Sequence, residues 1–268
     1  MTISKQFNIS NSGLTESPML FAHGYGCDQS MWNLITPHFS KDHRVVTFDF
    51  MGMGKSDSSL YKKEERQSLD SYADDIIKIC QDLNLKNVIF VGHSVSTMIG
   101  VLAAIKAPQY FSKLILIAPS PCYINRPGYE GGFERAQVEQ LLESISIDFL
   151  SWARAMAPMI MGRPDQPELG KELVNTFCKA NPNILRDFAY ATFLSDNRDD
   201  LSLVKIPTLI LQCAQDIIAP EAVGRYVHNQ ISGSQIKFLS ATGHCPHVSS
   251  PGETIDAIQT YLNQPEFL

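Results

Sequence analysis

Ser94 lies at the centre of the pentapeptide Gly92–Ser96, whose sequence is Gly-His-Ser-Val-Ser. The apolar run Val88–Val91 precedes it, and an apolar, helix-compatible stretch follows it. A serine between small residues at a sharp strand-to-helix turn is typical of a nucleophile elbow, which holds the hydroxyl clear for attack on a carbonyl carbon. The pattern usually ends in glycine, and here it ends in Ser96, a small residue that still allows close packing of helix and strand.

A serine hydroxyl needs a base within hydrogen-bond reach and a third group that orients this base. Asp216 follows the predicted strand Thr208–Gln212, and His244 follows the predicted strand Ile236–Leu239. Both therefore lie just beyond a strand, in the chain order serine, acid, histidine. We predict Ser94 as nucleophile, Asp216 as the acid and His244 as the base.

Other residues compete for two of these roles. His247 is a second candidate base, three residues beyond His244, and three further aspartates precede the strand instead of following it: Asp196, Asp199 and Asp200. Zinc binding by His244, Cys245 and His247 is disfavoured because the three are crowded and lack a fourth ligand at a recognisable spacing. We expect neither a metal nor a cofactor.

An oxyanion formed by attack on a carbonyl needs two hydrogen-bond donors. One predicted donor is the main-chain amide of Val95, which follows the nucleophile. The second is the amide of Tyr25, in the glycine-rich loop His23–Gly26 after the predicted strand Met19–Ala22. The neighbouring His23 and His93 are predicted to be structural hydrogen-bonding residues.

The elements that must position these residues alternate between short apolar runs and amphipathic segments. The remaining predicted strands are Val45–Phe50, Val88–Val91 and Leu114–Ala118, and the helices are Leu69–Leu83, Ser96–Ala107, Pro220–Gln230 and Glu253–Leu262. Strands that are apolar throughout suit a parallel sheet buried on both faces. The pattern predicts an α/β protein with a doubly wound, mostly parallel sheet.

The alternation breaks over residues 121–201, which contain no clear strand. Helical patches are predicted there at Gly132–Ile147, Phe149–Met161, Pro167–Lys179 and Pro182–Leu194. Because the sheet pattern resumes at Ile206 with the same character, an inserted helical cap is favoured over a separate domain. The expected organisation is one domain, with a core of residues 1–120 and 202–268 and a cap of residues 121–201.

The composition excludes several classes of function. The chain has 268 residues and a formal net charge of −6, which argues against nucleic-acid binding. No apolar run reaches membrane-spanning length, and residues 1–13 lack the apolar core of a signal peptide. The six cysteines are scattered and are expected to be reduced, small core residues of a cytoplasmic protein.

The motifs together resemble those of the α/β-hydrolase superfamily, and within it the RsbQ group of bacterial stress-response regulators and its plant relatives, the karrikin and strigolactone receptors. The segments that carry the resemblance are His23–Trp32, Gly92–Ser96, Pro119–Tyr123 and Gly243–His247. The resemblance implies a Ser94–Asp216–His244 triad, an oxyanion hole from the amides of Tyr25 and Val95, and a four-helix cap over an apolar pocket. For the RsbQ group it also implies action with a PAS-domain phosphatase.

We therefore expect a serine hydrolase that cleaves an ester-like bond of a small, largely apolar molecule. One alternative is a ligand-binding regulator with little or no turnover. Another is a cofactor-free haloperoxidase or a lyase that uses the same triad. A dehalogenase or an epoxide hydrolase would need a carboxylate at the position of Ser94.

Overall fold

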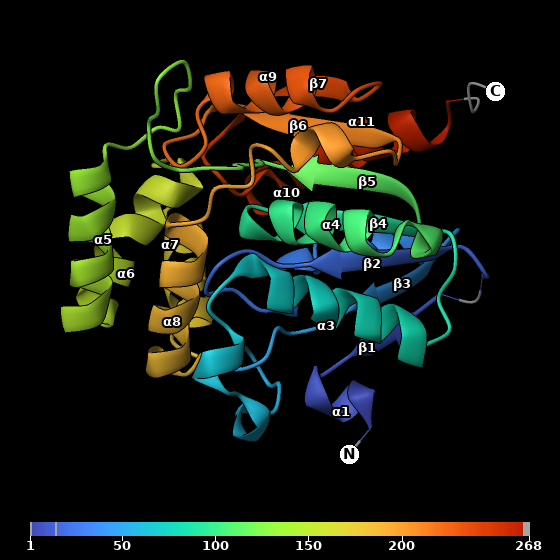
Figure 1. Cartoon of the computed structure of the whole chain (residues 1–268), viewed down its shortest axis with the longest axis horizontal. Coiled ribbons are helices and arrows are strands. Elements are labelled where there is room, and N and C mark those ends of the chain that lie inside the picture. The colour runs from blue at the N-terminus through green and yellow to red at the C-terminus, as the bar shows by residue number, and fades with distance from the viewer. Residues whose placement is uncertain (1, 14, 265–268) are drawn as a thin grey trace.

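The computed structural model describes residues 2–13 and 15–264, which form a seven-stranded sheet flanked by helices (Figure 1). The strand order is β1-β3-β2-β4-β5-β6-β7, and every pair is parallel except β1 with β3. The strands are β1 (Ser10–Ser12), β2 (Pro18–Ala22), β3 (Arg44–Thr47), β4 (Val88–His93), β5 (Phe111–Ile117), β6 (Thr208–Gln215) and β7 (Gln235–Thr242). The predicted α/β fold with a mostly parallel sheet is confirmed.

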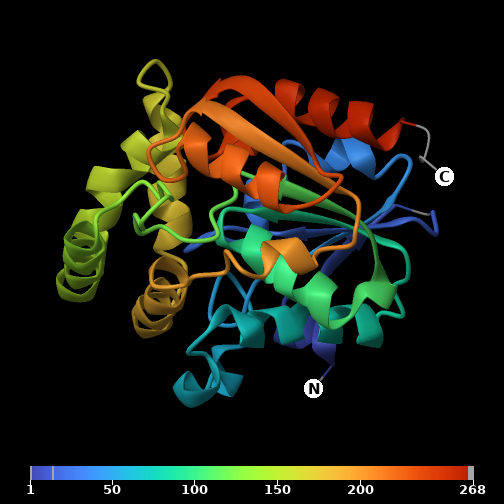
Figure 2. The same cartoon turned by 45° about the horizontal axis from the view of Figure 1, so that its top comes forward.

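Helices cover both faces of this sheet because its central strands present apolar side chains to each face (Figure 2). In β2, Leu20 packs into the core that includes α3 (Leu69–Asp82) and α4 (Val95–Lys106). Phe21 packs into the opposite core with residues of α2 (Thr36–Phe39) and α11 (Pro251–Leu262). The other core helices are α1 (Ile3–Gln6), α9 (Glu221–Gln230) and α10 (Pro246–Ser249).

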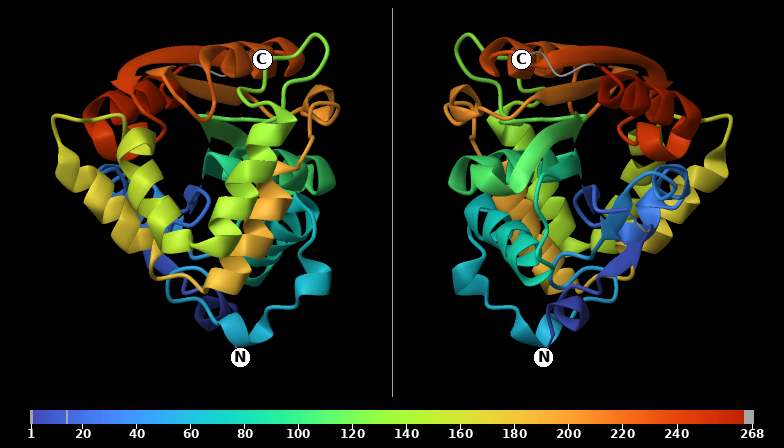
Figure 3. Two further views of the ribbon diagram at one scale, coloured as in Figure 1. Left: turned by 90° about the vertical axis from the view of Figure 1, so that its left-hand side faces the viewer. Right: turned by 90° about the vertical axis from the view of Figure 1, so that its right-hand side faces the viewer.

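Four further helices lie between β5 and β6 in the chain, beside the carboxyl ends of the strands (Figure 1). They are α5 (Arg135–Ile147), α6 (Phe149–Met161), α7 (Pro167–Phe177) and α8 (Pro182–Phe193). Helix α6 packs against α7 and α5 packs against α8, and the two pairs diverge in a V (Figure 3, left). The two ends of the segment that bears α5–α8 meet, since the main-chain N–H of Asn197 donates to the carbonyl of Pro121 over 2.7 Å.

Several predicted boundaries are wrong by a few residues, and the short elements α1, β1, α2 and α10 are absent from the prediction. Strand β3 ends at Thr47 rather than Phe50, because the Phe50 amide donates to Nε2 of His23 instead of to a neighbouring strand. The antiparallel strand β1 is exposed along its whole length, so it carries no apolar pattern. Helix α10 is a single turn, too short for a periodic signal.

Five of the six cysteines are buried, as predicted, but Cys178 is exposed. It is the C-cap residue of α7, directly after Phe177. Among the helices of the described residues, none is long and apolar enough to cross a bilayer.

Candidate active site

Ser94 occupies the sharp turn between β4 and α4, with a backbone φ of 56° and ψ of −125°. A positive φ in a residue other than glycine is strained and is retained where surrounding structure enforces it. Gly92 allows the turn, because a Cβ atom there would lie 2.6 Å from the carbonyl oxygen of Ser96. The geometry is that of a nucleophile elbow.

Ser96 replaces the glycine that usually ends this motif, and the structure gives the replacement a role. Its side chain is fully buried, and its hydroxyl donates to the carbonyl oxygen of His23. A buried hydroxyl without a partner would be costly, and this bond avoids that cost. It also ties the elbow to the loop that contains Tyr25.

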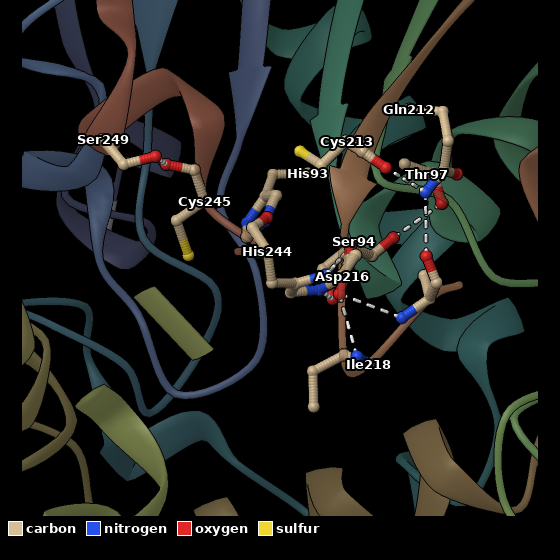
Figure 4. Close-up of polar contacts among 11 residues, drawn as sticks. His93, Ser94, Thr97, Gln212, Cys213, Asp216, Ile218, His244, Cys245 and Ser249 are labelled. Atoms are coloured by element: carbon tan, nitrogen blue, oxygen red, sulfur yellow. Dashed lines mark hydrogen bonds and ion pairs between the residues drawn. The ribbon is translucent and has the colours of Figure 1, made fainter. Parts of the chain in front are cut away.

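His244 follows β7 and links the other two predicted triad residues (Figure 4). Its Nε2 atom lies 2.7 Å from Oγ of Ser94, and its Nδ1 atom lies 2.7 Å from Oδ2 of Asp216. An ionised carboxylate only accepts hydrogen bonds, so Nδ1 of His244 carries the proton that faces Asp216. The lone pair of Nε2 then faces the hydroxyl of Ser94, as a general base requires.

The carboxylate of Asp216 is held by the loop that follows β6. Its Oδ1 atom accepts hydrogen bonds from the amides of Ile218, over 2.8 Å, and Ala219, over 3.1 Å. The amide of Gly243 donates to the carbonyl of Gln215 over 2.6 Å, which joins the loop of His244 to the loop of Asp216. Asp216 therefore presents Oδ2 to His244 in a fixed direction. The three rival aspartates lie elsewhere, before β6.

His93 and His247 form a cluster of buried rings with His244, in which the His93 centroid lies 5.0 Å from that of His244. The His247 ring packs with its centroid 4.5 Å from that of Trp32 and 4.5 Å from that of His93. Burial lowers the pKa of His93 well below its ordinary value and lowers the pKa of His247 to about 3. His93 is a structural hydrogen-bonding residue as predicted, and so is His23, whose Nε2 accepts from the Phe50 amide.

Tyr25 follows β2 and lines the same pocket as Ser94. Its hydroxyl donates to the carbonyl of Leu185 over 3.1 Å, and burial raises its pKa, so the phenol remains protonated. The ring packs against four aromatic side chains of the α5–α8 segment: Trp152, Phe177, Phe188 and Phe193. The side chain of Tyr25 is thus held by packing and by its hydrogen bond to Leu185.

The pocket lies between the sheet and the α5–α8 segment and has a volume of about 40 Å³. Because the centre of one water molecule needs roughly 10–15 Å³ of free space, this volume admits only a few waters in this conformation. Its lining is mainly apolar, from Tyr25, Cys27, Tyr123, Leu141, Trp152, Met156, Ile160, Leu173, Phe177, Phe193, Ile218 and Cys245, with Ser94, His93, His244 and Thr192 as polar members. In the described part of the chain, no three side chains of metal-binding type converge on a common site.

Comparison with known protein families agrees with this geometry. A model described as the alpha/beta hydrolase fold matches residues 17–251. The chain belongs to the α/β-hydrolase family.

Two similar relatives are plant proteins. A strigolactone esterase of Arabidopsis thaliana is 35% identical over 261 residues, which cover 97% of each chain. The karrikin insensitive 2 receptor CA of Petunia hybrida is 34% identical, again over 97% of each chain. Among solved structures, a hydrolase from Oleispira antarctica superimposes with a TM-score of 0.95 at 37% identity, over 98% of this chain and 97% of the other.

Proposed function

We propose that this protein is a serine hydrolase that cleaves an ester-like bond of a small, largely apolar molecule. The observation that carries the proposal is the line of hydrogen bonds from Asp216 through His244 to Ser94, which ends in an apolar pocket. A triad alone specifies no substrate, but the pocket offers little to bind a charged group. The esterase and receptor names of the relatives support a small organic ligand.

In the proposed mechanism, Oγ of Ser94 attacks the carbonyl carbon while Nε2 of His244 takes the hydroxyl proton. Asp216 holds the tautomer of His244 and stabilises the imidazolium that forms. The amides of Tyr25 and Val95 donate to the oxyanion. His244 then returns the proton to the leaving alcohol, and a water, deprotonated by the same imidazole, hydrolyses the acyl-serine.

The triad and the pocket wall come from different parts of the chain. Residues 1–120 and 202–268 form the core that supplies the triad, and residues 121–201 form a cap that supplies most of the pocket wall. Since the pocket has a volume of about 40 Å³, a substrate larger than a few waters must displace cap side chains as it enters. We infer that the cap selects the substrate while the core performs the reaction.

The test is the turnover of p-nitrophenyl acetate by wild type, Ser94→Ala and Ser112→Ala. Ser112 serves as a matched control, because its hydroxyl donates to the Asn87 carbonyl at the opposite end of the sheet. Ser94→Ala should lose all enzymatic turnover and keep the thermal unfolding midpoint of the wild type, whereas Ser112→Ala should keep the activity. Undiminished turnover in a folded Ser94→Ala protein would remove Ser94 as nucleophile.

A second candidate function is ligand-dependent regulation, which the receptor name of one relative favours. Under it, the ligand is bound and slowly cleaved, and the altered cap acts on a protein partner. The RsbQ-like motifs make a PAS-domain phosphatase the partner to test. The activity of such a phosphatase should change when wild type is added with a strigolactone or a karrikin, the ligand classes in the names of the relatives. No change with wild type or with Ser94→Ala would leave the hydrolase proposal standing alone.

A further inference from the structure

The last turn of α6 holds the loop that carries His244. The main-chain amide of His244 donates to the carbonyl of Ile160 over 2.7 Å, and the hydroxyl of Thr242 donates to the carbonyl of Gly162 over 2.8 Å. The last carbonyls of a helix have no partner within the helix. Here the carbonyls of Ile160 and Gly162 accept hydrogen bonds from His244 and Thr242, the two residues that flank Gly243.

Two glycines make this contact possible. Gly162 ends α6 in the left-handed conformation, with φ of 61°, and a Cβ atom there would lie 2.6 Å from both N and Cα of Gly243. Gly243 has φ of 83°, and a Cβ atom there would collide with the carbonyl oxygen of Met161. The two backbones therefore approach as closely as only glycine allows at both positions.

Helix α6 also forms part of the pocket wall. Trp152, Met156 and Ile160 all line the pocket, and Ile160 is the residue whose carbonyl holds His244. A molecule that presses on this wall presses on the element that locates the base. Because a displacement of about 1 Å in a reacting group can cost 10²-fold in rate, a small shift of α6 matters for chemistry.

We propose that Gly162 is a positioning residue for His244. The imidazole of His244 points at Ser94 only while the last turn of α6 keeps its hydrogen bonds to the loop Thr242–His244. This inference rests on the proposed function, because it assigns His244 as the base. Its consequence is a specificity rule: ligands that displace α6 misalign the base and are cleaved slowly, and ligands that leave it seated are cleaved fast.

Gly162→Ala tests the proposal, with Gly233→Ala as matched control. Gly233 has nearly the same backbone, with φ of 72°, but among the described residues no neighbouring atom lies within 4 Å of the position that a Cβ atom would take there. Both variants therefore carry the strain of alanine at positive φ, and only Gly162→Ala forces the two backbones apart. We expect kcat on p-nitrophenyl acetate to fall about 10- to 100-fold in Gly162→Ala, with KM changed less than threefold. Gly233→Ala should match the wild type.

A second variant and a second measurement test the proposal even if Gly162→Ala does not fold. Thr242→Val removes only the hydroxyl bond to Gly162 and should lower kcat about threefold even if Gly162→Ala fails to fold. The low-field proton resonance of Nδ1 of His244, assigned by its loss in His244→Gln, should shift in Gly162→Ala and Thr242→Val but not in Gly233→Ala. Unchanged kcat and an unchanged resonance in both variants would overturn the proposal. If wild type cleaves no ester but the resonance still shifts, the coupling holds and the proposed function fails.

Discussion

The imidazole of His93 donates from Nε2 to the carbonyl oxygen of His244 over 2.8 Å, and the two ring centroids are 5.0 Å apart. His93 directly precedes Ser94, so one side chain links the strand that leads to the proposed nucleophile with the loop that carries the proposed base. Its Nδ1 atom faces Gly24, where a Cβ atom would lie only 2.6 Å from it. His93 thus contacts the segments that carry Ser94, His244 and Tyr25.

Replacement of His93 separates its hydrogen bond from its packing. His93→Leu fills the site with an apolar side chain but loses the donor, and we expect kcat to fall about tenfold, because the carbonyl of His244 loses its hydrogen bond. His93→Gln retains an N–H donor and should recover a substantial part of the rate. The measurement is kcat and KM against pH for both variants. Equal rates in the two would show that packing, and not the hydrogen bond, is what matters.

Asp216→Asn should lower kcat by roughly 10⁴-fold while the fold is retained. The amides of Ile218 and Ala219 donate to Oδ1 of Asp216, so an asparagine there places its oxygen on these amides and its amide nitrogen toward His244. Nδ1 of His244 must then accept a hydrogen bond, and its proton moves to Nε2, which can no longer act as base. Turnover above one tenth of the wild-type rate would contradict this assignment.

Tyr25→Phe distinguishes the amide of Tyr25 from its side chain. The variant loses the hydrogen bond to the Leu185 carbonyl and should cost about 1 kcal/mol in the free energy of unfolding. Its kcat should remain within about threefold of wild type, because only the main-chain amide is proposed to contact the oxyanion. Tyr129→Phe, which loses a similar bond to the Cys122 carbonyl, is the control for stability. Loss of turnover in a folded Tyr25→Phe protein would assign chemistry to the phenol.

His247 makes the stability of the protein depend on pH. Its pKa is lowered from 6.5 to about 3 by burial, so below pH 6.5 the unfolded chain binds a proton that the folded chain refuses. Above pH 6.5 His247 is neutral in both the folded and the unfolded chain, and the free energy of unfolding is at its full value. As the pH falls from 6.5 toward 3, the unfolded chain gains a proton and this free energy decreases. At pH 5 the loss amounts to about 2 kcal/mol.

The variant His247→Phe keeps an aromatic ring against Trp32 and removes the titrating group. Its free energy of unfolding, measured with urea at pH 7 and at pH 5, should decrease less on acidification than that of wild type. His93, whose pKa is also lowered by burial, adds a dependence of the same sign in both proteins. Identical losses in wild type and variant would show that His247 is not the group responsible.

The parts of the fold that follow from local pattern were predicted well. The strands β2, β4, β5 and β6 contain long apolar runs, and the residues just beyond β6 and β7 are Asp216 and the loop of His244. Parallel strands end at the same edge of the sheet, so the order of these loops was enough to predict that the three side chains meet.

Contacts between distant segments were not predictable in this way. The hydrogen bond between His244 and Ile160 joins residues that no periodicity relates, and it depends on glycines whose positive φ leaves no trace in an apolar pattern. The exchange of the usual glycine for Ser96 is visible in the sequence, but its bond to the His23 carbonyl depends on the tertiary structure. The prediction that every cysteine is buried is wrong for Cys178, because residue type alone does not determine burial.

The meeting of Pro121 with Asn197 has an evolutionary consequence. Cys122 and Asp196 also pair in an antiparallel bridge, so the segment that bears α5–α8 leaves and re-enters the molecule through adjacent strands of backbone. Because the two ends of this segment lie side by side, its length and sequence can change without a change in the strand order of the sheet. Such a change would alter the pocket wall that α5–α8 supply and leave the turn that carries Ser94 in place.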